Sequence, residues 1–178
     1  MIRLFAALSI PPEIGQGLQT RQTGIDGARW RPLEALHVTL RFFGDVREDV
    51  ARDLDAELIG VSGQPFAIEL AGAGAFDNGQ GLDAVWAGVA ENAELRRLAG
   101  ACESAARRVG LKPEARNYKP HVTLAYLRHP DPAQVAAWIQ GNNLLKSPPI
   151  AVDRFGVYAS FQTHDGSRYR LEAEYPLT

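Results

Sequence analysis

The sequence predicts an α+β fold built from two lobes, and three observations carry this prediction. Apolar residues alternate between the spacing of strands and that of helices, in the order βαβαββαβαββ over 178 residues. The tetrapeptide His-Val-Thr-Leu occurs twice, at 37–40 and at 121–124. No linker or low-complexity tract separates the two similar halves around these copies. We therefore expect residues 1–178 to form a single domain of two pseudo-symmetric lobes, with an active cleft between them.

The N-terminal elements follow from apolar spacing and from the residues that begin and end them. Residues 2–9 are rich in apolar side chains and predict a strand. Two prolines then suit the first turn of a helix that runs to about Thr23. The first motif predicts a strand over 35–43, which Gly44 is expected to end. An amphipathic helix follows over 47–60.

The central elements surround a glycine-rich segment. Strands are predicted at 65–71 and 82–89, and the sequence AGAGAFDNGQG separates them. This segment lacks the Lys-Ser/Thr pair of a phosphate-binding loop and does not lead into a helix, so no nucleotide loop is expected there. The longest predicted helix spans 91–109, and the second motif predicts a strand over 120–127.

The C-terminal elements are a helix and a hairpin. The helix is predicted at about 132–140, after a turn at Pro130. Strands near 150–159 and 167–175 complete the chain, and residues 163–166 join them with an Asp-Gly pair, which is a strong hairpin signal.

The composition is that of an ordinary globular protein, with 46% hydrophobic and 22% charged residues. A net charge of −2 argues against electrostatic binding of duplex DNA or of an anionic membrane over a broad surface. The stretch around the second motif nevertheless carries six basic residues against Glu114 alone. Arg107 and Arg108 are expected to form the solvated end of a helix. The basic residues nearer the motif are candidates for phosphate contact: Arg116, Lys119 and Arg128.

The cysteine count and the N-terminus indicate a cytoplasmic protein. Cys102 is the only cysteine, so no internal disulfide can form, and its place in a predicted helix favours a buried structural thiol. The apolar run at the N-terminus is interrupted early by Pro11 and Pro12, which indicates a buried first strand in place of a signal peptide. No segment approaches membrane-spanning length.

The repeated motif combines a chemical face with a core face. In an extended strand, successive side chains point to opposite sides, so His and Thr share one side and Val and Leu the other. If the two strands face each other, two imidazoles and two hydroxyls converge on one small volume. The imidazoles can then act as acid and base, and the hydroxyls can hold an anion.

Residues outside the motifs add a family resemblance. Those that carry it are Ile2–Leu8, Arg29-Trp30, Phe42, Gly44, Gly72–Phe76, Val85-Trp86, Pro120, Ser160 and Tyr169. With the two motifs in order, the chain resembles the two-histidine phosphoesterases, specifically the RNA 2′,3′-cyclic phosphodiesterases historically called 2′-5′ RNA ligases. The resemblance implies an antiparallel sheet with outer helices in each lobe.

The resemblance also implies a reaction and a set of roles. The expected reaction is hydrolysis of a 2′,3′-cyclic phosphate to a 2′-phosphomonoester, without a cofactor or metal ion. His37 would donate a proton to the 3′ oxygen, and His121 would accept a proton from water, although the reverse assignment stays open. Thr39 and Thr123 would bind the nonbridging phosphate oxygens. The reverse reaction would join ends through a 2′-5′ bond.

Substrate contacts are expected from five residues near the motifs: Arg41, Arg116, Lys119, Tyr126 and Arg128. Tyr126 departs from the family pattern, because relatives often carry Arg directly after the Thr-Leu-Ala of the second motif. Arg128 would share a face with Tyr126 in a strand, and it is a candidate substitute. The expected partner is RNA with a 2′,3′-cyclic phosphate end or a cyclic nucleotide. No obligatory protein partner is expected, and the protein is predicted to be a monomer.

Three other interpretations stay open from the sequence. An RNA-end binding module without catalysis would use the basic flanks and stack a base on Tyr118 or Tyr126. A metalloprotein would use His37 and His121, although no recognised ligand spacing surrounds them and Asp45 is the nearest carboxylate after the first motif. Alternatively, both motifs are only buried strands. The remaining histidines, His129 in a turn and His164 in a hairpin tip, are expected to be exposed.

Overall fold

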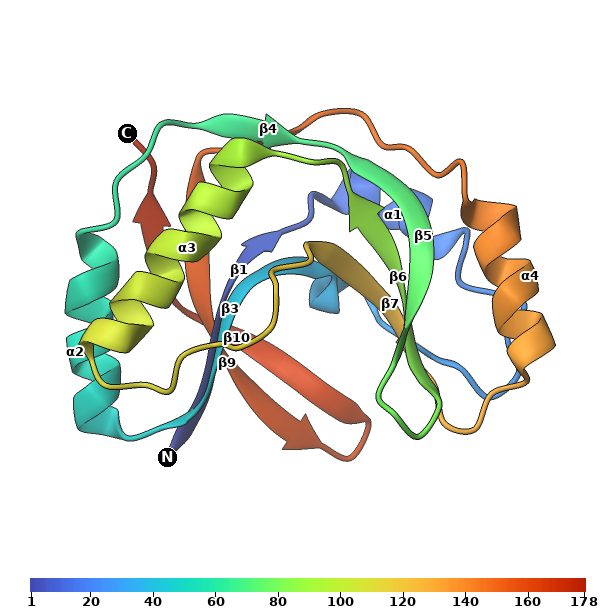
Figure 1. Cartoon of the computed structure of the whole chain (residues 1–178), viewed down its shortest axis with the longest axis horizontal. Coiled ribbons are helices and arrows are strands. Elements are labelled where there is room, and N and C mark those ends of the chain that lie inside the picture. The colour runs from blue at the N-terminus through green and yellow to red at the C-terminus, as the bar shows by residue number, and fades with distance from the viewer.

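Two four-stranded antiparallel sheets form the centre of the molecule, as seen in the computed structural model, which describes all 178 residues (Figure 1). The first sheet has the order β10-β9-β1-β3 and the second has the order β2-β7-β6-β5. The strands of the first sheet are β1 (Ile2–Ser9), β3 (His37–Val46), β9 (Arg154–Thr163) and β10 (Gly166–Pro176). Those of the second are β2 (Arg29–Trp30), β5 (Leu70–Asp77), β6 (Leu82–Val89) and β7 (His121–Tyr126).

Helices cover each sheet on the outside, so the predicted α+β fold of two lobes is confirmed. Helices α2 (Glu48–Ile59) and α3 (Ala93–Arg108) pack beside the first sheet, and α4 (Pro132–Asn142) packs on β5 of the second (Figure 1). Helix α1 (Pro12–Gln19) contacts the 3₁₀ turn η1 (Leu33–Ala35), which precedes β3.

The lobes are not successive halves of the chain, and the expected division into two such halves was wrong. The first sheet takes two strands from each end of the chain. Helix α3 directly follows β6 of the second sheet but packs on β3 of the first. The apolar faces of both lobes therefore join in one continuous buried cluster, which includes residues from both motifs.

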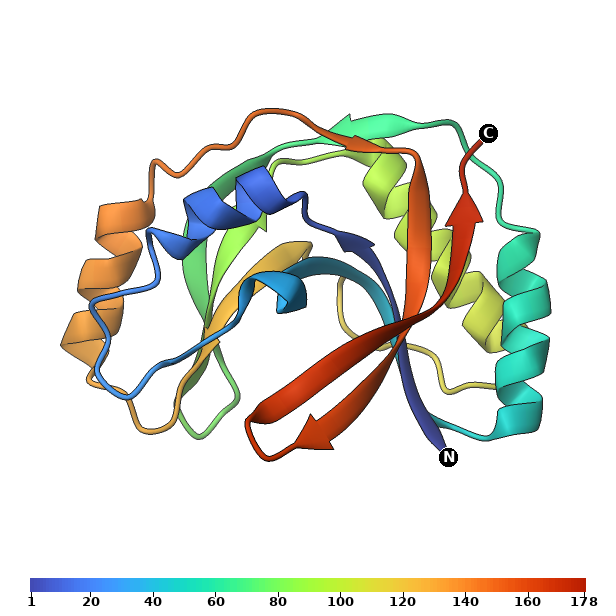
Figure 2. The same ribbon diagram turned by 180° about the vertical axis from the view of Figure 1, so that it is seen from behind.

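A two-stranded ribbon spans the lobes where the chain crosses between them. The strands predicted at 65–71 and 150–159 are each divided in the structure. Their first parts, β4 (Phe66–Ile68) and β8 (Ile150–Val152), pair with each other along one side of the molecule (Figure 2). The remainder of each predicted strand joins one of the large sheets. The division follows from this change of partner, which apolar spacing alone does not reveal.

The glycine-rich segment is mostly strand, which corrects its predicted role as a connection between strands. It forms β5, and only the residues near Asn78 turn toward β6. Gly74 lies under the ring of Trp86, where a Cβ atom would be only 2.4 Å from the nearest ring carbon. Gly72 has a φ of +75° at an irregularity in the pairing with β6. These glycines therefore allow close packing and a bulge within the sheet.

Strand β3 and helix α1 end at residues other than those predicted. Strand β3 continues past Gly44, which has a φ of +78° and lies at a bulge opposite β1. Helix α1 ends at Gln19, before the predicted Thr23. The carbonyl of Arg21 instead accepts a hydrogen bond of 2.8 Å from Trp138 Nε1, so contacts with α4 replace further helical turns.

The apolar half of each motif lies in the core, as predicted. Val38, Leu40, Val122 and Leu124 are buried, and each such side chain contributes about 1.5–3 kcal/mol of transfer free energy. Cys102 is also buried, as expected, and burial raises the pKa of its thiol to about 12. No helix is long and apolar enough to cross a membrane.

Candidate active site

The two motif strands lie in different sheets and contact each other. Strand β3 begins with His37 and β7 begins with His121. In both strands the His and Thr side chains are half-buried, whereas the alternate Val and Leu are buried. The alternation predicted from the sequence is therefore present in both copies, and the structural context on either side of them is also similar.

Each imidazole is held in the same way by the backbone that precedes it. His37 Nδ1 lies 2.8 Å from the carbonyl oxygen of Ala35, and His121 Nδ1 lies 2.7 Å from that of Lys119. A carbonyl oxygen only accepts, so Nδ1 carries the hydrogen in both rings and Nε2 is left for chemistry. In His37, Nε2 is 3.0 Å from Thr39 Oγ1, which donates its hydrogen to the neutral ring.

Burial lowers the pKa of both histidines, and the charge of His121 also acts on His37. Desolvation is the main cause of the low pKa of His37, about 4, and the nearby charges of His121 and Arg31 lower it further. Desolvation also lowers the pKa of His121, with a further contribution from the charge of Lys119. The two imidazoles therefore belong to one site.

Aromatic rings surround each histidine. The ring centroid of His37 is 4.9 Å from that of Phe5 and 5.3 Å from that of Tyr169. The centroid of His121 is 4.7 Å from that of Phe76. These contacts explain the desolvation of both imidazoles. Only their place in the family resemblance marked these aromatic residues in the sequence.

Of the five predicted substrate-binding residues, Lys119 and Tyr126 lie near the motifs' chemical groups. Lys119 Nζ is 4.7 Å from the ring centroid of Trp86, and its charge lowers the pKa of His121. Tyr126 ends β7 with 39% of its surface exposed. Its ring faces the guanidinium of Arg31, which was not among the residues predicted from the sequence to contact the substrate.

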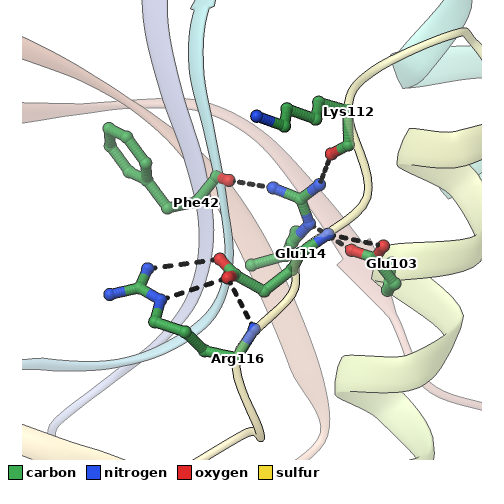
Figure 3. Close-up of polar contacts among 6 residues, drawn as sticks. Phe42, Glu103, Lys112, Glu114 and Arg116 are labelled. Atoms are coloured by element: carbon green, nitrogen blue, oxygen red, sulfur yellow. Dashed lines mark hydrogen bonds and ion pairs between the residues drawn. The ribbon is translucent and has the colours of Figure 1, made fainter.

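Arg41 points away from the histidines, because a bulge changes the face of the strand. Thr39 pairs with Ala7 and Arg41 with Ala6, so Leu40 is an extra residue and both Leu40 and Arg41 are buried. The guanidinium of Arg41 forms an ion pair with Glu103 of α3. It also donates to the backbone carbonyls of Phe42 and Lys112 (Figure 3). Arg41 therefore joins β3 to α3 and to the segment before the second motif, and it does not face the site.

The same network extends to Arg116. Glu103 accepts a hydrogen bond of 3.1 Å from the backbone nitrogen of Glu114. The Glu114 carboxylate in turn accepts from Arg116, whose side chain is 85% exposed (Figure 3). Hydrogen bonds from Arg116 lower the pKa of Glu114 to about 2. Arg128 is exposed and forms no side-chain hydrogen bond, and His129 and His164 are also exposed, as expected.

Tyr118 connects the segment before the second motif to the first motif. Its hydroxyl donates a hydrogen bond of 2.8 Å to the backbone carbonyl of Thr39. This contact fixes the ring against β3. The structure assembles no group of three or more His, Cys, Asp or Glu side chains of the kind that binds a metal ion.

Comparison with known proteins identifies the family of this chain. The family model of the 2′-5′ RNA ligase superfamily matches residues 10–160. The RNA 2′,3′-cyclic phosphodiesterase of Archaeoglobus fulgidus is 29% identical over 95% of this chain and 97% of that protein. The one from Thermus thermophilus is 33% identical over 74% of this chain and 71% of that protein.

Solved structures extend the match to the whole fold. The crystal structure of E. coli LigT complexed with 3′-AMP is 25% identical and superposes with a TM-score of 0.79, over 99% of this chain and 98% of that one. The resemblance inferred from the two motifs and their flanks is thereby confirmed. The chain belongs to the 2′-5′ RNA ligase superfamily.

Proposed function

We propose that this protein hydrolyses 2′,3′-cyclic phosphate ends of RNA or of nucleotides to 2′-phosphomonoesters, without a metal ion. The observation that carries the proposal is the matched pair of imidazoles, each bound through Nδ1 to a carbonyl and each with Nε2 left for proton transfer. The superfamily match and the relatives named RNA 2′,3′-cyclic phosphodiesterase support the substrate class.

The proposed reaction uses one histidine as base and the other as acid. Neutral His121 takes a proton from water at Nε2 while the water oxygen bonds to phosphorus. The bond from phosphorus to the 3′ oxygen breaks, and protonated His37 delivers a proton from Nε2 to that oxygen. A free 5′ hydroxyl in place of water would form a 2′-5′ linkage from the same groups.

The threonines are proposed to bind the nonbridging phosphate oxygens. Thr39 and Thr123 lie two residues after the histidines on the same strand faces. Their hydroxyls would hold phosphorus in line with the attacking water and stabilise the charge of the transition state. Because Thr39 donates to His37 in the free protein, phosphate binding would redirect this hydroxyl toward an oxygen of the substrate.

The low pKa of His37 requires the substrate to assist its protonation. At neutral pH the free imidazole is neutral, and the negative charge of a bound phosphodiester favours the protonated form. Since both histidines titrate below 6.5 in the free protein, we expect a bell-shaped profile of kcat/KM with its maximum below pH 6.5. A maximum above pH 7 would contradict this protonation scheme.

The reaction is tested with a short RNA that ends in a 2′,3′-cyclic phosphate, in excess EDTA. Wild-type protein and the variants His37→Ala and His121→Ala are compared, and ³¹P NMR identifies the product. A 2′-phosphate formed by the wild type alone supports the metal-free mechanism with two histidines. Absence of turnover by the wild type, or turnover that survives both substitutions, contradicts it.

A substrate whose leaving group needs no proton distinguishes the acid from the base. A 3′-deoxynucleoside 2′-phosphate esterified with p-nitrophenol keeps the bond from phosphorus to the 2′ oxygen and releases, in place of the 3′ oxygen, an anion that needs no proton. Loss of the acid should therefore matter little for this substrate. We expect His37→Ala to retain far more of its wild-type activity on this ester than on the cyclic phosphate. His121→Ala should be impaired on both. The opposite pattern would exchange the two roles.

An RNA-end binding module without catalysis is the competing function. The pair of proton-transfer groups disfavours it, because binding a phosphate needs neither an acid nor a base. Wild-type protein that binds the cyclic-phosphate RNA in EDTA but leaves it intact would support this alternative.

We further propose that the protein acts as a cytoplasmic monomer. Both motifs lie in one chain, so the proposed site needs no second copy. Analytical ultracentrifugation should give a mass near 19.4 kDa, and a dimer mass at micromolar concentration would contradict the monomer. Fractionation of the native cells should recover the protein with the cytoplasmic marker.

A further inference from the structure

Arg31 lies where the two sheets approach each other. It directly follows β2, and its backbone nitrogen donates a hydrogen bond of 2.8 Å to the carbonyl of Leu124 in the second motif. Six residues later the chain reaches His37 of the first motif. The backbone of Arg31 is therefore tied to one motif strand and leads into the other.

The side chain of Arg31 lies against two tyrosine rings. Its Cζ is 5.5 Å from the ring centroid of Tyr126 and 5.6 Å from that of Tyr169. Nη2 donates to the Ser167 carbonyl at 3.2 Å and to the Tyr169 hydroxyl at 3.3 Å. These contacts hold the guanidinium plane between β7 and the β9-β10 hairpin.

This half-buried cation has no anionic partner in the protein. None of the ten ion pairs includes Arg31, whereas the buried Arg41 is paired with Glu103. The N–H groups on Nε and Nη1 of Arg31 donate to no protein atom. These free N–H groups can each donate to an oxygen of a bound phosphate.

The guanidinium is also close to the proposed chemistry. Its charge is one of the two that lower the pKa of His37, together with the charge of His121. Tyr169, which contacts the guanidinium, also packs against the ring of His37. An anion held beside His37 would therefore find the free donors of Arg31 close by.

We propose that Arg31 binds the scissile phosphate through its free N–H groups, with Tyr126 and Tyr169 holding its guanidinium in position. This role deepens the proposed function and rests on it. Arg31 supplies a positive charge beside His37, as Lys119 does beside His121, whereas Arg41 and Arg116 are paired with carboxylates. Because Arg31 lies against the ring of Tyr126, an arginine introduced at position 126 would bring a guanidinium to the same region.

The test compares Arg31→Gln, Arg31→Lys and the double variant Arg31→Gln with Tyr126→Arg. With cyclic-phosphate RNA, Arg31→Gln should lower kcat/KM about 100-fold, as does loss of one donor to a transition-state oxyanion. Arg31→Lys should recover only part of this loss, because an ammonium keeps the charge but lacks the planar group with five N–H donors. The double variant should recover about tenfold. Arg52→Gln, on the exposed surface of α2, is the control for loss of one charge.

A purely structural role for Arg31 predicts different results. If Arg31 only fastened the hairpin, Tyr169→Phe would impair activity as much as Arg31→Gln, since each removes the hydrogen bond between them. Tyr126→Arg would then restore nothing. Either result, or a kcat/KM for Arg31→Gln within threefold of that for Arg52→Gln, would overturn the proposal.

Binding of inorganic phosphate tests the role of Arg31 independently of the proposed reaction. In ³¹P NMR titrations, phosphate should bind the wild type at least tenfold more tightly than Arg31→Gln, whether or not cyclic phosphate is hydrolysed. Equal phosphate affinity would overturn the role of Arg31. Wild-type protein that binds phosphate through Arg31 but hydrolyses no cyclic phosphate would overturn only the reaction.

Discussion

The first and second motifs have the same backbone geometry but different surroundings. In both, the imidazole is bound to a carbonyl two residues earlier, and the leucine is an extra residue in a bulge. Both strands consequently bury the leucine and the residue after it, and expose the next one, Phe42 or Tyr126. The repeated tetrapeptide therefore specifies a repeated local structure, including the place where each strand changes face.

The surroundings make the two histidines chemically unequal. His37 packs against Phe5 and Tyr169, and the charge of Arg31 lowers its pKa. His121 packs against Phe76, and the charge of Lys119 lowers its pKa. General acid-base catalysis requires one ring to be protonated and the other to be neutral when the reaction begins. The comparison shows how identical tetrapeptides can take unequal roles through their neighbours.

The largest expected effect is loss of either imidazole. His37→Gln and His121→Gln should each lower kcat on cyclic phosphate by roughly 10²–10⁴-fold, because each removes one proton-transfer group. The measurement is single-turnover hydrolysis at saturating protein. A variant that kept more than a tenth of the wild-type rate would show that its histidine is not the acid or base.

Acid pH should lower the free energy of unfolding, because His37 has a low pKa in the folded protein. His37 has a pKa of about 4 when folded and about 6.5 when unfolded, so the unfolded state binds more protons as the pH falls below 6.5. The stabilisation is complete above pH 6.5, and about 3 kcal/mol should be lost by pH 4. Urea unfolding of the wild type, relative to His37→Gln, measures this loss. An NMR titration in which His37 had a pKa near 6.5 would contradict it.

Loss of either threonine hydroxyl should lower activity less than loss of a histidine. The two threonines should also differ in their effect on the pKa of the histidine in the same motif. Thr39→Val and Thr123→Val should each lower kcat/KM by about 10- to 100-fold, as expected for a hydrogen bond to a charged group. Only Thr39 also donates to a histidine in the free protein. Its loss should therefore raise the pKa of His37, because the donated bond favours the neutral ring. Unchanged histidine titrations in Thr39→Val would argue against that bond.

The smallest effect on activity should come from the Arg41 ion pair. Glu103→Gln leaves a buried guanidinium without its carboxylate and should lower the free energy of unfolding by about 2 kcal/mol, less than for a fully buried pair because Glu103 is partly exposed. The KM for cyclic phosphate should stay within about twofold of the wild type, since Arg41 faces α3. A large rise in KM with unchanged stability would instead support the substrate contact predicted for Arg41 from the sequence.

Much of the site was predictable because it depends on local spacing. The period of two along a strand is enough to put His and Thr on one face and Val and Leu in the core. The Asp-Gly pair is enough to predict the β9-β10 hairpin, which forms as expected. These features depend on residues close together in the chain, so they can be predicted from the sequence.

The sequence by itself therefore determined the α+β class, the two motif strands and the chemistry of their exposed faces. Tertiary structure decided which strands share a sheet, where the bulges turn Arg41 toward Glu103, and that Arg31 lies against Tyr126 and Tyr169. The physical reason is that strand pairing, close packing and the partner of a charged side chain all depend on residues distant in sequence. Only folding brings those residues together.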